Sequence, residues 1–117
     1  MSFTAVIITN VTGDQLANSI PFTFYEDREW TYTLGENFIT YWESSGPWHD
    51  KPLATIIKNI NSPKVFIIDS NSFVLFKRFV AAIHERISLI IYNDDEGFYT
   101  KEDVASMVDL NSFLPAQ

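Results

Sequence analysis

The stretch that decides the fold is residues 22–43, FTFYEDREWTYTLGENFITYWE. Its turn dipeptides, Asp27-Arg28 and Gly35-Glu36, divide it into three predicted strands over 22–26, 29–34 and 37–43. In the second strand apolar and polar side chains alternate, which is typical of an antiparallel strand with one solvated face. The third strand is apolar on both faces, so we expect it near the centre of the sheet. The stretch therefore predicts an antiparallel meander.

Other segments extend this pattern on both sides. Residues 3–9 are apolar and β-branched and predict a buried strand, whereas 14–19 fits either one helical turn capped by Asp14 or an irregular loop. After the meander the apolar period becomes helical, with two short apolar runs between the helices. The sequence predicts helices from Asp50 to Pro63, from Ser70 or Asn71 to about Ile87, and from Thr100 onward, and buried strands over 65–68 and 89–92. In the last helix Thr100 and Asp103 have the spacing of a capping box, and Val104, Met107 and Val108 are expected on its apolar face.

The later elements follow the order strand, helix, strand, helix. A right-handed crossover would place strands 65–68 and 89–92 side by side as a parallel pair. We therefore expect an α+β fold, a mixed sheet with an N-terminal antiparallel meander and a C-terminal βαβα unit, and helices mainly on one face. A length of 117 residues with 46% apolar composition predicts a single globular domain over 1–117.

Composition and motifs exclude several classes of function. The chain has no cysteine, which removes disulfides, thiolate metal sites and cysteine nucleophiles. It also lacks a Gly-x-Ser-x-Gly, Walker or His-Glu-x-x-His motif, so we expect no enzyme, no catalytic residue, no bound metal and no cofactor. Of the two histidines, His84 is expected on a solvated helix face, while Asp50 could either orient His49 or cap a helix. The apolar run 5–8 is too short for a signal peptide or a membrane span, which predicts a cytoplasmic protein.

Charge is segregated along the chain. Residues 1–49 hold six carboxylates and one cation, 50–92 hold six cations and three carboxylates, and 93–117 again hold six carboxylates and one cation, for a net charge of −7. A negative field attracts basic surfaces and repels nucleic acid and anionic membranes. The sequence therefore predicts a basic protein partner and no binding to nucleic acid or membrane.

The leading hypothesis is a small acidic inhibitor or immunity-type protein that covers the active cleft of a basic partner such as a nuclease toxin. Its carboxylates would replace substrate phosphates, and exposed aromatic side chains would anchor the contact. Of two acidic patches, the one within 94–103 is favoured because half of its residues are acidic. The predicted partner-binding residues are Asp94, Asp95, Glu96, Glu102 and Asp103, then Glu26, Asp27 and Glu29, with Tyr25 and Trp48 as aromatic anchors.

Two alternatives remain open at this point. The first is a divalent-cation-dependent enzyme or ligand-binding domain, in which Asp69 and the carboxylates of 94–96 would meet beyond the ends of the predicted parallel strands and hold Mg²⁺ or Ca²⁺. Against this, aspartate and asparagine at such positions are common turn and capping residues. The other alternative is a subunit of a larger assembly that uses the aromatic meander. The sequence leaves the partner's identity and the oligomeric state open.

Overall fold

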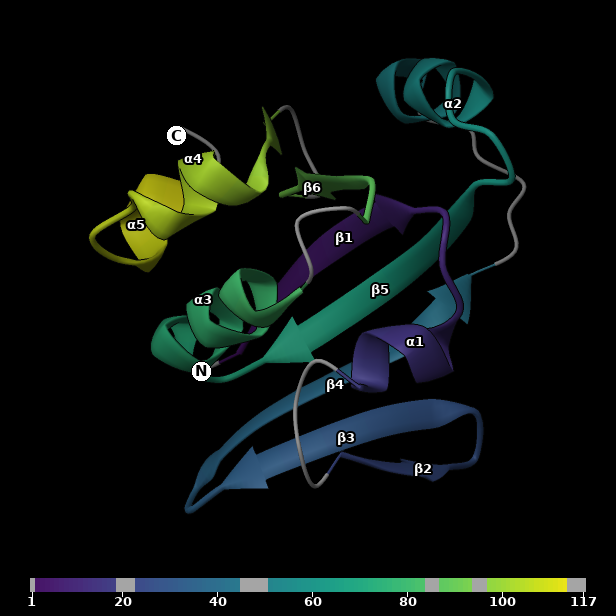
Figure 1. Cartoon of the computed structure of the whole chain (residues 1–117). Coiled ribbons are helices and arrows are strands. Elements are labelled where there is room, and N and C mark those ends of the chain that lie inside the picture. Colours follow the sequence, from purple (N-terminus) through teal and green to yellow (C-terminus); the bar gives the residue numbers. More distant parts are fainter. Residues whose placement is uncertain (1, 19–22, 45–50, 84–86, 94–96, 114–117) are drawn as a thin grey trace.

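The structure is a computed structural model that describes residues 2–18, 23–44, 51–83, 87–93 and 97–113, without the side chains of 51–53. The strands of these residues form one sheet in the order β2-β3-β4-β5-β1-β6-β7 (Figure 1). The strands are β1 Phe3–Thr9, β2 Phe24–Glu26, β3 Glu29–Leu34, β4 Asn37–Ser44, β5 Lys64–Ser70, β6 Leu89–Tyr92 and β7 Phe98–Tyr99. The helices are α1 Gly13–Ala17, α2 Lys51–Lys58, α3 Phe73–Ala82, α4 Lys101–Ala105 and α5 Leu110–Phe113.

The predicted meander is confirmed. β2, β3 and β4 pair antiparallel in sequence order, and β4 lies inside the sheet between β3 and β5, as its two apolar faces predict. The turn between β2 and β3 has positive φ at both central residues, 52° at Asp27 and 68° at Arg28. This is the backbone of a type I′ turn, which usually carries Asn-Gly. β2 forms one edge of the sheet.

The predicted parallel pair is wrong. β5 and β6 run in the same direction, but β1 lies between them and is antiparallel to both, so every pair of neighbouring strands among the described residues is antiparallel. The reason is the apolar run Ala5–Ile8. Ala5 and Ile7 belong to one hydrophobic cluster, and Val6 and Ile8 belong to another. A strand that is apolar on both faces is most stable in the interior of a sheet, so it displaces the expected contact between β5 and β6.

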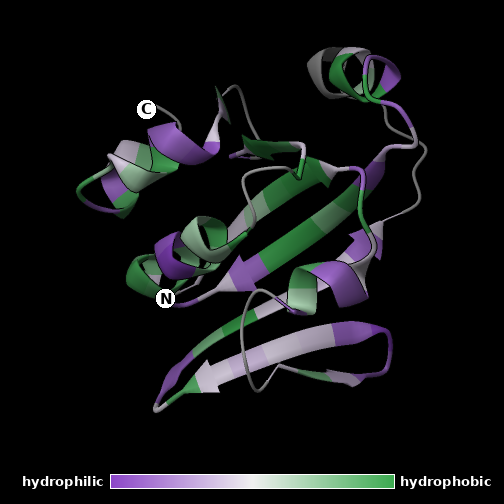
Figure 2. Ribbon diagram, viewed as in Figure 1, coloured by the Kyte–Doolittle hydropathy of each residue, from purple (hydrophilic) through white to green (hydrophobic). Residues whose placement is uncertain are grey.

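Helices lie on both sides of the sheet but mainly on one. Side chains of α1, α3, α4 and α5 pack with those of β1, β4, β5 and β6 in the larger cluster, and we call this side the covered face. α2 packs on the opposite side, where its Ile56 and Ile57, together with the following Ile60, pack against a smaller cluster that includes Val6 and Ile8. In Figure 2 the apolar ribbon is concentrated along β1 and β5, while β3 is paler. The α+β class with helices mainly on one face is therefore confirmed.

α1 packs directly on the aromatic rings of the meander. Its N-cap is Thr12, not Asp14, and Gln15 completes a capping box. Asp14 instead accepts a hydrogen bond from the indole N–H of Trp30 at 3.1 Å, and the Tyr41 hydroxyl donates to the carbonyl of Gly13 at 3.0 Å. A Cβ at Gly13 would overlap the Trp30 ring, so the close approach of α1 requires glycine there.

The β5–α3 junction differs from its prediction. Ser72 caps α3 by accepting from the amide of Leu75 at 3.2 Å, so neither Ser70 nor Asn71 is the cap. The hydroxyl of Ser70 donates to the carbonyl of Phe38 at 2.8 Å. The side chain of Asn71 bridges the β3–β4 turn, accepting from the amide of Phe38 and donating to the carbonyl of Glu36. These contacts fix the end of β5, on which Asp69 lies.

The C-terminal elements agree in part with expectation. α3 ends at Ala82, short of Ile87, because Ile83 is extended, whereas the capping box of Thr100 and Asp103 at α4 is confirmed. β7 was not predicted, and Val108, expected on an apolar helix face, is 88% exposed. Lysine side chains link the two helices: Lys77 donates to the carbonyl of Met107, and Lys101 donates to that of Ile83. Among the helices described here, none is both long and apolar enough to span a bilayer.

Candidate functional site

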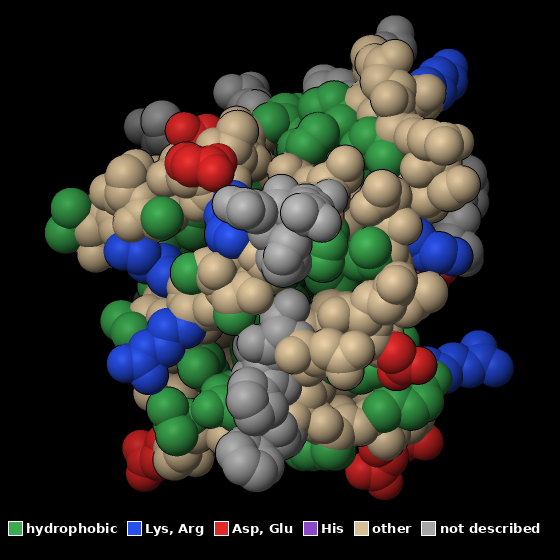
Figure 3. Space-filling model, in the orientation of Figure 1, with side chains coloured by type: hydrophobic (Ala, Val, Ile, Leu, Met, Phe, Trp, Pro, Cys, Tyr) green, Lys and Arg blue, Asp and Glu red, His purple; other side chains and the backbone are tan. Residues whose placement is uncertain are grey.

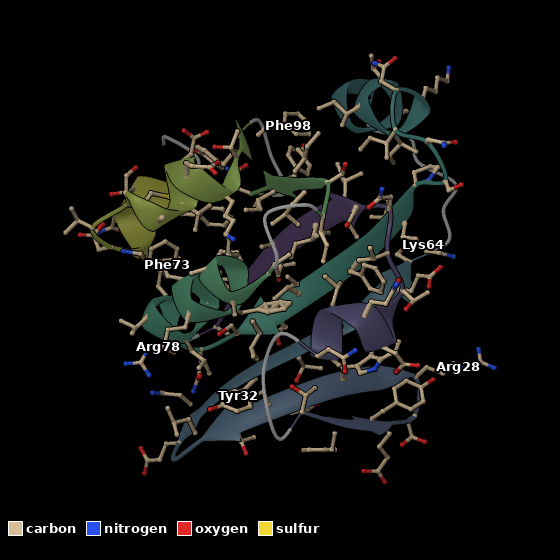
Figure 4. The ribbon with its side chains drawn as sticks, viewed as in Figure 1. Arg28, Tyr32, Lys64, Phe73, Arg78 and Phe98 are labelled. Atoms are coloured by element: carbon tan, nitrogen blue, oxygen red, sulfur yellow. The ribbon has the colours of Figure 1, made fainter. Side chains whose placement is uncertain are left out.

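The β2–β3 hairpin presents four of the predicted partner-binding residues together. Tyr25, Glu26, Asp27 and Glu29 are all exposed, and the Tyr25 side chain retains 55% of its accessible surface. Its ring rests on Trp30 with 4.6 Å between centroids. At the tip of the hairpin Arg28 points away from the body of the molecule (Figure 4). The hairpin therefore exposes an aromatic ring on the side of the covered face, while Glu26 and Glu29 project to the opposite side.

Two of these carboxylates are held in an unfavourable arrangement. Glu26 and Glu29 are direct cross-strand partners and project to the same side of the sheet. Like charges at directly opposed positions destabilise a β-sheet. Among the described residues the salt bridge joins Lys64 to Glu43 at 3.9 Å, and no residue of the hairpin takes part in it. The hairpin thus keeps negative charge that the described part of the chain does not neutralise.

These glutamates border a larger surface on the side of the sheet opposite the covered face. Strand alternation and register place side chains of β1 to β5 on it together. We call this surface the open face, and it consists of Thr4, Phe24, Glu26, Glu29, Thr31, Thr33, Phe38, Thr40, Trp42, Ile67 and Asp69.

The open face differs in burial from the rest of the sheet. All of its residues are exposed or half-buried, and the Phe24 side chain retains 51% of its accessible surface. Its apolar side chains, Phe24, Phe38, Trp42 and Ile67, belong to neither hydrophobic cluster of the described residues. On the next positions of the same strands, Ile39, Tyr41, Phe66 and Ile68 are fully buried.

Charge also separates the two sides. Figure 3 views the covered face, on which both blue cationic and red acidic side chains are visible. On the open face, as defined by its described residues, every charged side chain is a carboxylate: Glu26, Glu29 and Asp69. The open face therefore consists mainly of apolar side chains and threonine hydroxyls, and its charged side chains are all negative.

One cross-strand row runs through the middle of this surface. In register order it comprises Phe24, Thr31, Thr40, Asp69 and Thr4. The hydroxyls of Thr31 and Thr40 are hydrogen-bonded at 3.2 Å. Trp42 pairs with Ile67 and is therefore diagonal to Asp69, a spacing that aromatic side chains can span.

The acidic patch favoured from the sequence is described only in part. Asp94, Asp95 and Glu96 lie outside the described residues, as does Trp48. Glu102 is exposed in the first turn of α4, whereas the carboxylate of Asp103 accepts from the amide of Thr100 at 2.9 Å as a helix cap. Beside them lies an open hollow of about 510 Å³, lined by Phe98, Tyr99, Asp103, Ser106, Met107, Val108 and Ser112.

The strand order does not support the alternative cation site at Asp69 and the carboxylates of 94–96. It required β5 and β6 to be neighbours, but β1 separates them, so their ends are two strand spacings or about 10 Å apart. Asp94 and Asp95 are outside the described residues, as are His49, Asp50 and His84. In the described part of the chain, no three His, Cys, Asp or Glu side chains are grouped closely enough to hold a metal ion.

Sequence reasoning missed most of the open face. The apolar side chains of 37–43 correctly predict a central strand, but a strand in the interior of a sheet can still have one face that no helix covers. The signal was available in the threonines of β3 and β4, because Thr31, Thr33 and Thr40 fall on the same side as Phe38 and Trp42. A row of threonines there is typical of a solvated strand face.

Comparisons with known proteins give no assignment: no protein-family model matches the chain, and neither the curated proteins nor the solved structures contain a match.

Proposed function

We propose that this protein is a small, acidic, non-enzymatic binding protein, an inhibitor or immunity-type protein that neutralises a basic partner such as a nuclease toxin by covering its active cleft. The observation that carries the proposal is the hairpin, in which Glu26 and Glu29 face each other on one side of the sheet with no salt bridge among the described residues, while Tyr25 is exposed on the other side. The negative charges of Glu26 and Glu29 repel each other at the surface, and a cationic cleft would reduce this repulsion on binding.

The carboxylates of Glu26, Asp27 and Glu29 act in place of the phosphates that a nuclease cleft binds. Their field accelerates encounter with a positively charged surface, and this effect weakens as ionic strength rises. The aromatic side chains then exclude water from the contact, which is where interfaces gain most of their binding energy.

The hairpin is supported so that its anchor is already in place before binding. Tyr25 rests on Trp30, which stacks on Tyr41 at 5.4 Å and 7° between ring planes. Tyr41 in turn stacks on the fully buried Phe79. This chain of rings connects the hairpin to the core, so little conformational entropy is lost when a partner covers Tyr25.

The segment 94–103 remains a second candidate contact. Glu102 supplies an exposed carboxylate in its described part, while Asp103 is engaged as a cap. Substituting the carboxylates of each patch in a separate variant shows which of the two patches contacts the partner.

The test begins with the immobilised protein, native lysate at low salt and a salt gradient, followed by purification of the eluted basic protein. The variant Glu26→Gln/Asp27→Asn/Glu29→Gln should then slow association with that protein and flatten its salt dependence. Asp94→Ala/Asp95→Ala/Glu96→Ala tests the other patch. Glu36→Gln, which removes an exposed carboxylate from the β3–β4 turn, is the control.

The proposal fails if the association rate and its salt dependence are the same for both patch variants and the unsubstituted protein. Binding that persists at high salt would instead favour the alternative, a subunit of a larger assembly, because apolar contacts are not screened by ions. Loss of the partner's enzymatic activity on binding would distinguish an inhibitor from a passive binder.

A further inference from the structure

Asp69 is an ionisable group on the open face, near the end of β5 and between β4 and β1. It is half-buried, and its cross-strand neighbours, Thr4 and Thr40, carry no charge. No hydrogen bond or ion pair joins its carboxylate to another side chain among the described residues. Covering a carboxylate with an apolar surface is costly unless the surface supplies a compensating charge. A partner that brings a cation to Asp69 avoids this cost and is therefore favoured over one that does not.

The surroundings of Asp69 favour one kind of cation. Trp42 lies diagonal to it on β4, and Thr40 lies directly beside it with a hydroxyl group. An indole ring next to a carboxylate suits a guanidinium, which stacks on an aromatic face while its planar N–H groups donate to the carboxylate. An ammonium offers neither the planar stacking nor the paired donors.

The charge of the face also selects among possible occupants. A second copy of this chain, placed face to face, would set its own Asp69, Glu26 and Glu29 against the same carboxylates, and each copy carries a net charge of −7. Nucleic acid would be repelled for the same reason. A protein surface with a projecting cation is complementary to it.

We propose that the open face binds an arginine side chain of the partner protein, with its guanidinium between the carboxylate of Asp69 and the indole of Trp42. This inference rests on the proposed function, in which the partner is a basic protein, and it adds the surface and the side chain that are recognised. The glutamates of the hairpin border the same face, so one partner contacts the hairpin and the arginine site together.

The test uses two peptides of equal charge, amidated octa-arginine and octa-lysine, titrated into the full chain by calorimetry at low salt. Octa-arginine should bind about fivefold more tightly than octa-lysine, the ratio expected from one stacked guanidinium. Backbone amide shifts in NMR spectra should be largest at 40–42 and 67–69. Asp69→Asn should abolish the preference for arginine, while Glu36→Gln, with the same change in charge, should retain it.

Trp42→Leu should also abolish the preference, and Trp42→Phe, which keeps an aromatic ring, should retain part of it. If a Trp42 variant does not fold, the result for Asp69→Asn decides the question alone, since Asp69 is only half-buried and its direct cross-strand neighbours are the threonines Thr4 and Thr40. Equal affinity for the two peptides, or identical behaviour of Asp69→Asn and Glu36→Gln, would overturn the arginine site.

The two proposals fail in different ways. Equal binding of the two peptides contradicts the arginine site even when the hairpin triple variant slows association with the captured partner. Conversely, unchanged association of that triple variant contradicts the proposed function, whatever the peptides show.

Discussion

The two faces of β4 show how one strand can serve two purposes. On the covered face its Tyr41 is buried between Trp30 and Phe79 and donates a hydrogen bond to α1. On the open face, one residue further along, Trp42 is half-buried and belongs to neither hydrophobic cluster of the described residues. Both are large aromatic residues, so residue type does not distinguish a core position from a surface position on this strand.

The difference lies in what each side has to pack against. Helices α1, α3, α4 and α5 close the covered face, whereas α2 packs against Val6, Ile8, Val65 and Tyr92 at the other end of the opposite side (Figure 1). Stability should therefore depend on the covered face and partner binding on the open face and the hairpin.

The largest contrast is expected between two phenylalanines. Phe79→Ala on the covered face should lower the free energy of unfolding by about 3–5 kcal/mol, because it removes a fully buried ring and leaves a cavity. Phe24→Ala on the open face should lower it by less than about 1 kcal/mol. Urea unfolding of both variants measures the two values. Similar losses would show that Phe24 is packed and that the open face is not open.

Tyr41→Phe should cost about 1 kcal/mol, since it removes the hydrogen bond to the carbonyl of Gly13. Its effect should depend on pH. Burial, with a smaller contribution from the nearby Asp14, raises the pKa of the Tyr41 hydroxyl well above its ordinary value. The stabilisation that follows is complete below the unfolded pKa of about 10 and is lost as pH rises above it.

The unsubstituted protein should therefore lose stability above about pH 10 more steeply than the Tyr41→Phe variant. Thermal unfolding followed over a range of alkaline pH would show this. Parallel pH profiles for the two proteins would mean that the Tyr41 hydroxyl ionises with equal ease in the folded and unfolded chains.

Arg28→Gly should raise stability by about 0.5–1 kcal/mol, because glycine adopts the positive φ of this turn position without strain. It also removes the cation from the hairpin, so association with a basic partner should become faster. Gly35→Ala, at a φ of 63° in the next turn, is a matched control with the opposite sign. A loss of stability in Arg28→Gly would show that the arginine side chain makes a stabilising contact.

The smallest expected change in stability is that of Glu26→Gln. Removing one charge of the Glu26–Glu29 pair should stabilise the fold by about 0.2–0.5 kcal/mol at low salt and by less at high salt. The same change should slow binding of the basic partner. Melting curves at two ionic strengths, together with association rates, would detect the trade-off. A variant that is destabilised would indicate that Glu26 has a structural role.

Local patterns in the sequence were sufficient for most elements. The alternation in 29–34 predicted β3 with its bounds, and the spacing of Thr100 and Asp103 predicted the cap of α4. The end of α3 and the identity of its cap were not predicted, because Ser70, Asn71 and Ser72 are all good caps and only their tertiary contacts separate them. Ser70 and Asn71 bind the β3–β4 turn, which leaves Ser72 to cap the helix.

The sequence predicted the hairpin residues of the candidate site, but not the surface of the sheet to which Glu26 and Glu29 belong. The sequence alone placed Tyr25, Glu26, Asp27 and Glu29 at a hairpin, because turn residues and strand alternation are local properties. It could not show that Asp69 joins Trp42 on the same surface. That depends on the pairing of β4 with β5, which are separated by α2 in the chain.

The sequence by itself determined most of the strands and helices, the meander and the acidic character of the hairpin, all of which arise from side chains within a few residues of one another. Only the tertiary structure decided that β1 lies between β5 and β6, and that one side of the meander lacks a helix among the described residues. The physical reason is that strand order depends on which apolar faces can be buried together over the whole chain, and this competition is not encoded in any single segment.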